Sequence, residues 1–234
     1  MSAILDFLYP RNCLGCGAPA PTTFRHICWD CWSDTLKVEP PFCRICGDPV
    51  AGAVSHDFVC FSCADSPPAF DLARSVVRYD GVVGEALKRL KYHRALWLAP
   101  DLAELMHGCL KAEYGELEFD WVVPVPLYHV RRRERGFNQS TLLAHALARQ
   151  ISCKSTDRFI KRIRPTATQT HLTAPQRLSN VHDAFESKRE KQLAGQRVLL
   201  VDDVMTTGAT VNACAKALKK GGAASVHVLT VARG

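Results

Sequence analysis

The 234-residue sequence predicts an α/β fold, in which a small cysteine-rich module precedes a mostly parallel sheet with helices on both faces. From residue 72 onward, short apolar runs alternate with segments of helical spacing, as is typical of parallel sheets. Eight of the eleven cysteines fall within the first 63 residues. A Pro-Pro pair within residues 66–71 separates the two patterns. We therefore expect two units, residues 1–68 and residues 69–234.

The cysteines of the first unit form four CxxC pairs, a spacing that aims two thiolates at one tetrahedral metal ion. The segment CLGCG at 13–17 returns as CRICG at 43–47, and a second pair follows each copy. This duplication predicts a double zinc ribbon with two structural zinc ions, paired either sequentially or with the first pair joined to the third. Disulfides are disfavoured because the opening residues do not resemble a signal peptide. The expected zinc ligands are Cys13, Cys16, Cys28, Cys31, Cys43, Cys46, Cys60 and Cys63.

The elements of the second unit follow from hydrophobic spacing and from turn residues. Strands are expected at 73–79, 121–126, 157–163, 197–201 and 225–232. Helices are expected at 82–92, 98–114, 139–151 and 209–220, the last one ended by Gly221-Gly222. Ligands of such sheets bind beyond the carboxyl ends of the strands, which directs attention to the residues after 126 and after 201.

Residues 198–210 read VLLVDDVMTTGAT and carry the strongest functional signal. Two adjacent acids, Asp202 and Asp203, end a buried strand, and a Thr-Thr-Gly turn then opens a helix. The helix N-terminus attracts an anion, and carboxylates accept hydrogen bonds from vicinal sugar hydroxyls. Strand alternation sends the two carboxylates in different directions. The pattern predicts a sugar-phosphate site.

Two further segments complete the expected site. PVPLYHVRRRERGFNQS (124–140) offers four arginines that suit bidentate contact with pyrophosphate, although a solvated corner or a nucleic-acid patch is the alternative. The polar segment 165–185, with Gln169 and Arg177, has the length of a lid, although a static surface loop is the alternative.

The positive charge is concentrated in the second unit. Residues 1–70 hold four Lys/Arg and seven Asp/Glu, whereas residues 71–234 hold 26 Lys/Arg and 16 Asp/Glu. This excess suits a polyanionic ligand. No run of about 18 apolar residues predicts a membrane span, and together with the opening residues this favours the cytoplasm.

VLLVDDVMTTGAT resembles the 5-phosphoribosyl-1-pyrophosphate (PRPP) signature of type I phosphoribosyltransferases. The resemblance implies a catalytic pair, Asp202 and Asp203, on the ribose 2′- and 3′-hydroxyls. It also implies magnesium, held mainly by pyrophosphate and hydroxyl oxygens. The implied PRPP-binding residues are Arg131, Arg135, Val204, Met205, Thr206, Thr207, Gly208, Ala209 and Thr210.

The four CxxC pairs, RGFNQS, TQTHL and VDDVMTTGAT, in this order, resemble the ComF family, and KRLKYHR (88–94) also suits it. The family implies a zinc ribbon followed by a phosphoribosyltransferase-like domain, acting in natural transformation and DNA uptake. Three functions follow as hypotheses. The first is a PRPP-binding protein that also binds single-stranded DNA, with stacking by Trp29, Trp32, Tyr128 and Phe137. The second is an active phosphoribosyltransferase with an unidentified acceptor. The third is a zinc-ribbon adaptor for a helicase-like uptake component.

Overall fold

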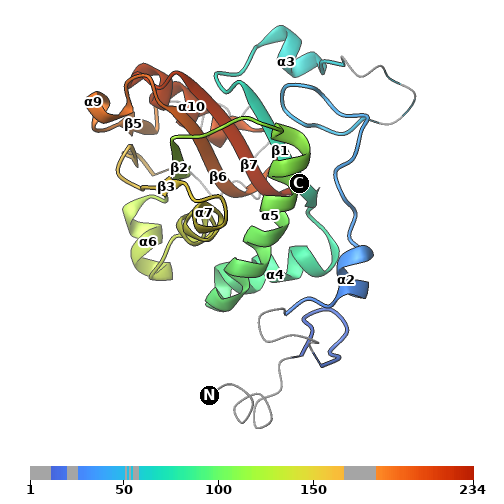
Figure 1. Cartoon of the computed structure of the whole chain (residues 1–234). Coiled ribbons are helices and arrows are strands. Elements are labelled where there is room, and N and C mark those ends of the chain that lie inside the picture. The colour runs from blue at the N-terminus through green and yellow to red at the C-terminus, as the bar shows by residue number, and fades with distance from the viewer. Residues whose placement is uncertain (1–11, 20–25, 51, 53, 55–57, 166–182) are drawn as a thin grey trace.

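The computed structural model describes residues 12–19, 26–50, 52, 54, 58–165 and 183–234 (Figure 1). Its centre is a five-stranded sheet in the order β1-β7-β6-β2-β3, and every neighbouring pair is parallel. The strands are β1 (Leu72–Arg78), β2 (Trp121–Pro124), β3 (Lys154–Ser155), β6 (Arg197–Met205) and β7 (Ser225–Arg233). The predicted fold class is confirmed. Within the described ranges, no helix is long and apolar enough to cross a membrane.

Helices cover both faces of this sheet. One face carries α4 (Gly81–Tyr92), η1 (Leu96–Leu98), α5 (Ala99–Tyr114) and α7 (Gln139–Gln150). The other face carries α10 (Ala209–Lys220) and an antiparallel hairpin of β4 (Ile160–Arg162) and β5 (Phe185–Ser187), with the short helix α9 (Glu190–Leu193) after it. Alternation along β6 divides its side chains, since Leu199 and Val201 enter the first core and Val198 and Leu200 enter the second.

Several elements differ from the expected ones. The strand expected at 121–126 ends at Pro124, and β3 and β5 were not expected. The arginine segment forms a helix, α6 (His129–Arg135), which buries no residue and ends at Gly136, a left-handed glycine with φ of 82°. The strand expected at 157–163 shrinks to β4, which pairs with β5 and lies outside the main sheet. Strand β6 continues four residues further than expected, because β7 runs beside it until Met205 pairs with Arg233.

The cysteine-rich module wraps around the β1 edge of the sheet. Its first half, with α2 (Trp29–Ser33), packs on the α4/α5 face, while its second half, with α3 (Phe61–Asp65), enters the opposite core. Between them, residues 36–38 run antiparallel to β1: Val38 N–H donates to the Val76 carbonyl (3.1 Å), and Arg78 N–H donates to the Leu36 carbonyl (2.7 Å). The module therefore covers backbone groups that a bare edge strand would expose.

Two nearly buried arginines of the sheet form hydrogen bonds with the second half of the module. Arg74 of β1 donates to the Arg44 carbonyl (3.2 Å) and pairs with Glu113 of α5 (3.0 Å). Arg233 of β7 donates to the Cys46 carbonyl (3.2 Å) and pairs with Asp48 (2.7 Å). The cysteine module is thus packed against the α/β core on both faces of the sheet.

Candidate ligand site and cysteine clusters

The carboxylates of Asp202 and Asp203 lie almost buried at the end of β6, with 8% and 5% of their residue surfaces exposed. Asp202 Oδ1 accepts hydrogen bonds from Ser140 Oγ (2.7 Å) and from the Asp203 N–H (2.9 Å). Asp203 Oδ2 instead lies 2.5 Å from Lys91 Nζ of α4. The two acids therefore contact different elements, as strand alternation predicts.

Burial decides the charge state of this cluster. Burial, followed by the neighbouring Asp203 charge, raises the pKa of Asp202 to about 7, and the hydrogen bonds from Ser140 and the Asp203 N–H offset only part of that rise. Burial by itself lowers the pKa of Lys91, but the Asp203 carboxylate outweighs burial and leaves the pKa of Lys91 above its usual value. A ligand that brings hydroxyl donors or a cation to Asp202 relieves this excess negative charge.

The residues after β6 form a glycine turn that leads into α10. Gly208 adopts φ of +77°, and a Cβ there would stand 2.8 Å from Met205 Cε. The Asn212 N–H donates to the Gly208 carbonyl (2.9 Å), which begins α10. The first turn of a helix has no intrahelical acceptors for its N–H groups, so these groups favour an anion here. Met205 and Ala209 are buried in the second core, so they contribute backbone and not side chain to this turn.

The arginine helix lies next to this site through the start of α7. Arg135 Nη1 donates to Gln139 Oε1 (2.5 Å), and its guanidinium lies 5.5 Å from the centroid of the Tyr92 ring. Gln139 directly precedes Ser140, which holds Asp202. Arg131 is exposed and pairs with Glu134 (3.2 Å). The expected lid residues Gln169 and Arg177 lie outside the described residues.

Sequence reasoning missed the roles of Lys91 and Ser140. Leu87 and Leu90 are buried on α4, and Lys91 follows Leu87 by four positions, so it lies on the same apolar stripe. A lysine on an apolar stripe is the signal that suggests a buried carboxylate partner. Ser140 is placed by Asn138, whose Oδ1 accepts from the Ser140 N–H (3.1 Å) and whose Nδ2 donates to the Val125 carbonyl (3.0 Å).

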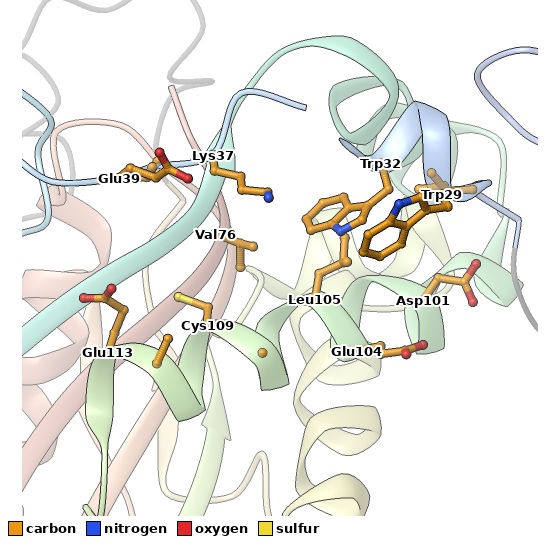
Figure 2. Close-up of a pocket in the computed structure, with 14 residues that line it drawn as sticks. Trp29, Trp32, Lys37, Glu39, Val76, Asp101, Glu104, Leu105, Cys109 and Glu113 are labelled. Carbon is orange, nitrogen blue, oxygen red and sulfur yellow. The ribbon is translucent and has the colours of Figure 1, made fainter. Parts of the chain in front are cut away.

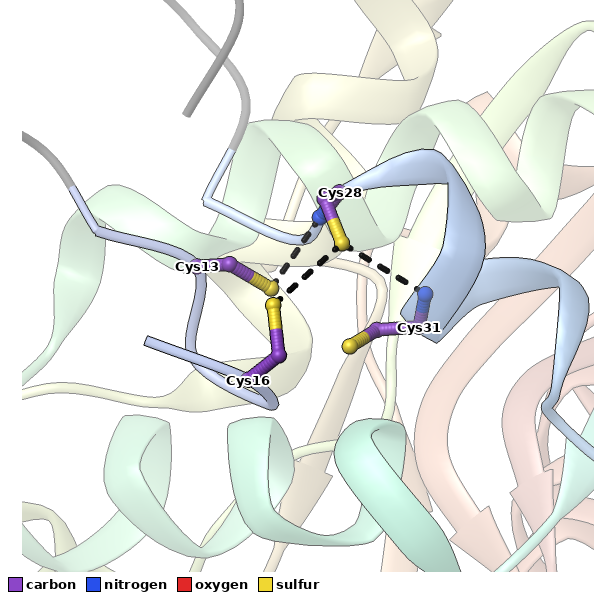
Figure 3. Close-up of side chains that lie close together, drawn as sticks. All are labelled: Cys13, Cys16, Cys28 and Cys31. Atoms are coloured by element: carbon purple, nitrogen blue, oxygen red, sulfur yellow. Dashed lines mark hydrogen bonds between the residues drawn. The ribbon is translucent and has the colours of Figure 1, made fainter. Parts of the chain in front are cut away.

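The eight module cysteines form two groups of four, and the pairing is sequential. Cys13, Cys16, Cys28 and Cys31 make one group (Figure 3), and Cys43, Cys46, Cys60 and Cys63 make the other. Within each group the sulfur atoms all lie within 4.8 Å of one another. This geometry excludes the interleaved pairing that the spacing left open.

In each group, backbone N–H donors stabilise one thiolate, whereas the pKa of other cysteines is raised, by the neighbouring sulfurs at Cys31 and by burial at Cys46. The Cys28 N–H donates to Cys13 Sγ (3.2 Å), and the Cys60 N–H donates to Cys43 Sγ (3.3 Å). Burial opposes ionisation of Cys13, but the backbone N–H groups of Cys28, Cys16 and Gly15 outweigh burial and lower the pKa of Cys13 to about 6. In the same way the pKa of Cys43 falls to about 7. Four converging sulfurs with N–H donors fit a structural zinc ion, which such residues would hold without an open position for catalysis.

Comparison with known proteins finds two family models along the chain. A double zinc ribbon domain model matches residues 4–64, and a phosphoribosyl transferase domain model matches residues 138–234. Competence protein F of Haemophilus influenzae is 30% identical over 95% of this chain and 96% of its own. DNA utilization protein YhgH of Salmonella typhimurium is 34% identical over 96% of this chain and 97% of its own. Competence protein ComFC of Bacillus subtilis is 30% identical over 88% of this chain and 84% of its own.

Among solved structures, adenine phosphoribosyltransferase covers 62% of this chain at 16% identity and a TM-score of 0.35, a likeness too weak to support an assignment.

Proposed function

The chain belongs to the ComF family, and from this premise we propose that it binds PRPP at the β6–α10 turn and acts in DNA uptake and utilization. The observation that carries the proposal is the joined arrangement of two buried carboxylates and a helix N-terminus at one strand end. The carboxylates suit the ribose hydroxyls, and the turn suits the 5′-phosphate.

Arg135 and the start of α7 lie on the Asp202 side of the site, where they suit the pyrophosphate of the same ligand. Magnesium would arrive with PRPP, held mainly by pyrophosphate and hydroxyl oxygens, and the buried carboxylate of Asp202 adds negative charge that favours the cation beside the sugar. The cytoplasm is the expected location, because its reducing conditions keep the eight module thiols free to hold zinc.

Calorimetry on the full zinc-loaded chain tests the proposal. PRPP with magnesium should bind to the wild-type protein, and the paired change Asp202→Asn and Asp203→Asn should abolish that binding. Asp65→Asn, at an exposed position in α3, is the matched control and should bind as the parent does. Absence of heat with folded parent protein, or equal binding by the paired variant, contradicts the proposal.

Turnover is a separate question from binding. Release of pyrophosphate from PRPP, measured across a panel of nucleobase and amine acceptors, decides between an enzyme and a PRPP-binding protein. Release with any acceptor, abolished by the paired aspartate variant, establishes an active phosphoribosyltransferase. Tight binding without release across the panel favours a binding role.

Single-stranded DNA is the second ligand of the proposal, and the exposed arginine helix supports it. The side chains of Arg131 and Arg132 are each 61% exposed, and exposed ion pairs such as theirs are weak. Tyr128 and Phe137 flank this helix, whereas Trp29 and Trp32 lie in the cysteine module. Anisotropy with a 20-nucleotide thymidine strand should show affinity that falls steeply with salt, and Arg131→Gln with Arg132→Gln should reduce the salt slope. A flat salt dependence contradicts electrostatic DNA binding.

A further inference from the structure

A groove of about 400 Å³ lies between the cysteine module and α5, away from the β6–α10 turn (Figure 2). Its floor is the outer face of α5, where Leu105, Gly108, Cys109 and Ala112 follow one another at helical spacing, together with Val76 of β1. Trp29 and Trp32 of α2 stand at one end. The groove thus offers small and apolar surface along about two turns of helix.

The two tryptophans give this groove the character of a binding surface. Trp29 is 68% exposed, although an indole ring is among the side chains that gain most from burial. Tryptophan is also enriched among the residues that dominate protein–protein affinity. An exposed indole beside an apolar helix face therefore indicates surface that another molecule covers.

The polar groups of the groove are concentrated in charged side chains, and most of them are acidic. Among the described residues, four acids line the groove against one lysine, Lys37: Glu39, Asp101, Glu104 and Glu113. Three of the acids interact inside this chain. Glu113 pairs with Arg74 (3.0 Å), Asp101 accepts the His26 N–H (2.6 Å), and Glu104 also has an interaction within the chain. The charged side chains that line the groove therefore still carry a net negative charge, whereas the whole chain has a formal net charge of +7.

This charge distribution selects the class of occupant. Carboxylates repel a phosphate backbone, so the groove does not suit nucleic acid. The described floor side chains are apolar, without the convergent polar groups that orient small metabolites. A peptide segment with large apolar side chains would match the apolar floor of the groove, and basic residues on either side of them would match the acidic residues along its rim. We propose that this groove docks a segment of a partner protein that carries large apolar side chains flanked by lysine or arginine.

This docking site is independent of the PRPP proposal, because the groove shares no residue with β6, the following turn or α10. It gives the module a role beyond holding zinc. The helix α2 that supplies both tryptophans has Cys28 as its N-cap residue and contains Cys31, so the first cysteine group fixes the position of the groove wall.

The test is a selection of random 12-residue peptides against the full zinc-loaded chain, followed by anisotropy with the selected peptides. Gly108→Gln is the blocking variant, because Gly108 is exposed and a Cβ there meets nothing within 4 Å. Lys111→Gln introduces the same side chain at an exposed α5 position that does not line the groove. Glu39→Lys combined with Glu104→Lys reverses the charge of the rim.

The selected peptides should carry at least two large apolar residues and net positive charge. Gly108→Gln should weaken them tenfold or more, Lys111→Gln should leave affinity within twofold, and the charge reversal should weaken them most at low salt. The proposal is overturned if the selection enriches no peptide, if the selected peptides share an acidic or uncharged consensus, or if they bind Gly108→Gln as tightly as the parent protein. If Gly108→Gln instead loses binding to the thymidine strand, nucleic acid is the occupant of the groove and the proposal fails. If Gly108→Gln abolishes a self-association that the parent protein shows, a second copy of the chain is the occupant and the proposal also fails.

Discussion

Replacement of Lys91 by methionine probes the buried ion pair beneath the candidate ligand site. The side chains of Lys91 and Asp203 are 16% and 6% exposed, and their charged atoms lie 2.5 Å apart. Methionine keeps the apolar stem that packs beside Leu87 and Leu90 but leaves the Asp203 charge buried without a cation. Breaking a buried pair from one side costs about 3–5 kcal/mol. Because Asp203 Oδ1 retains the Val204 N–H (2.8 Å), we expect a loss of about 3 kcal/mol.

Urea unfolding of the zinc-loaded protein measures this loss as a change in the free energy of unfolding. Lys88→Met, on the exposed side of α4, is the control and should change stability by less than about 0.5 kcal/mol. The double variant Lys91→Met with Asp203→Asn removes both charges and should recover most of the loss, which gives a coupling energy of about 2 kcal/mol.

The pH dependence has a definite sign. The pKa of Lys91 is raised in the folded protein, so its stabilising contribution is fully present below the pKa of an unfolded lysine and is lost as pH rises through the folded pKa. A cost below about 1 kcal/mol for Lys91→Met, or no recovery in the double variant, would refute the assignment of a stabilising buried pair.

Three further changes extend the reasoning. Burial raises the pKa of Asp202 to about 7, so this carboxyl favours the fold most in acid and that contribution is lost between about pH 4 and pH 7. Asp202→Asn should therefore gain about 2–4 kcal/mol relative to the parent across that window in pH-dependent unfolding. Gly208→Ala, forced into φ of +77°, should lose about 1 kcal/mol of stability and about tenfold in PRPP affinity by calorimetry. Cys46→Ser, in the buried second cysteine group, should lower the thermal midpoint of unfolding by roughly 5–10 °C. Cys16→Ser, at an exposed position, should lower it by less. Equal shifts would contradict the packing of the second cysteine group into the core.

The sequence by itself determined most of the architecture of this protein. Apolar runs and helical spacing depend on neighbouring residues along the chain, so the sheet strands β1, β2, β6 and β7 and helices such as 209–220 follow from local pattern, whereas the two-residue strand β3 does not. The run VLLVDDVMTTGAT placed both acids and the glycine turn at one strand end, because chain order alone keeps them together. CxxC spacing likewise fixed the cysteine pairs but not which pairs combine.

Only the tertiary structure decided the contacts between distant segments. Lys91 lies 112 positions before Asp203, and no local pattern brings those two side chains together. The sequential cysteine groups, the wrapping of the module around β1, and the groove between α2 and α5 depend on how packed faces meet. Hydrophobic burial sets which face of an element turns inward, whereas the partner across that face is chosen by the fold as a whole.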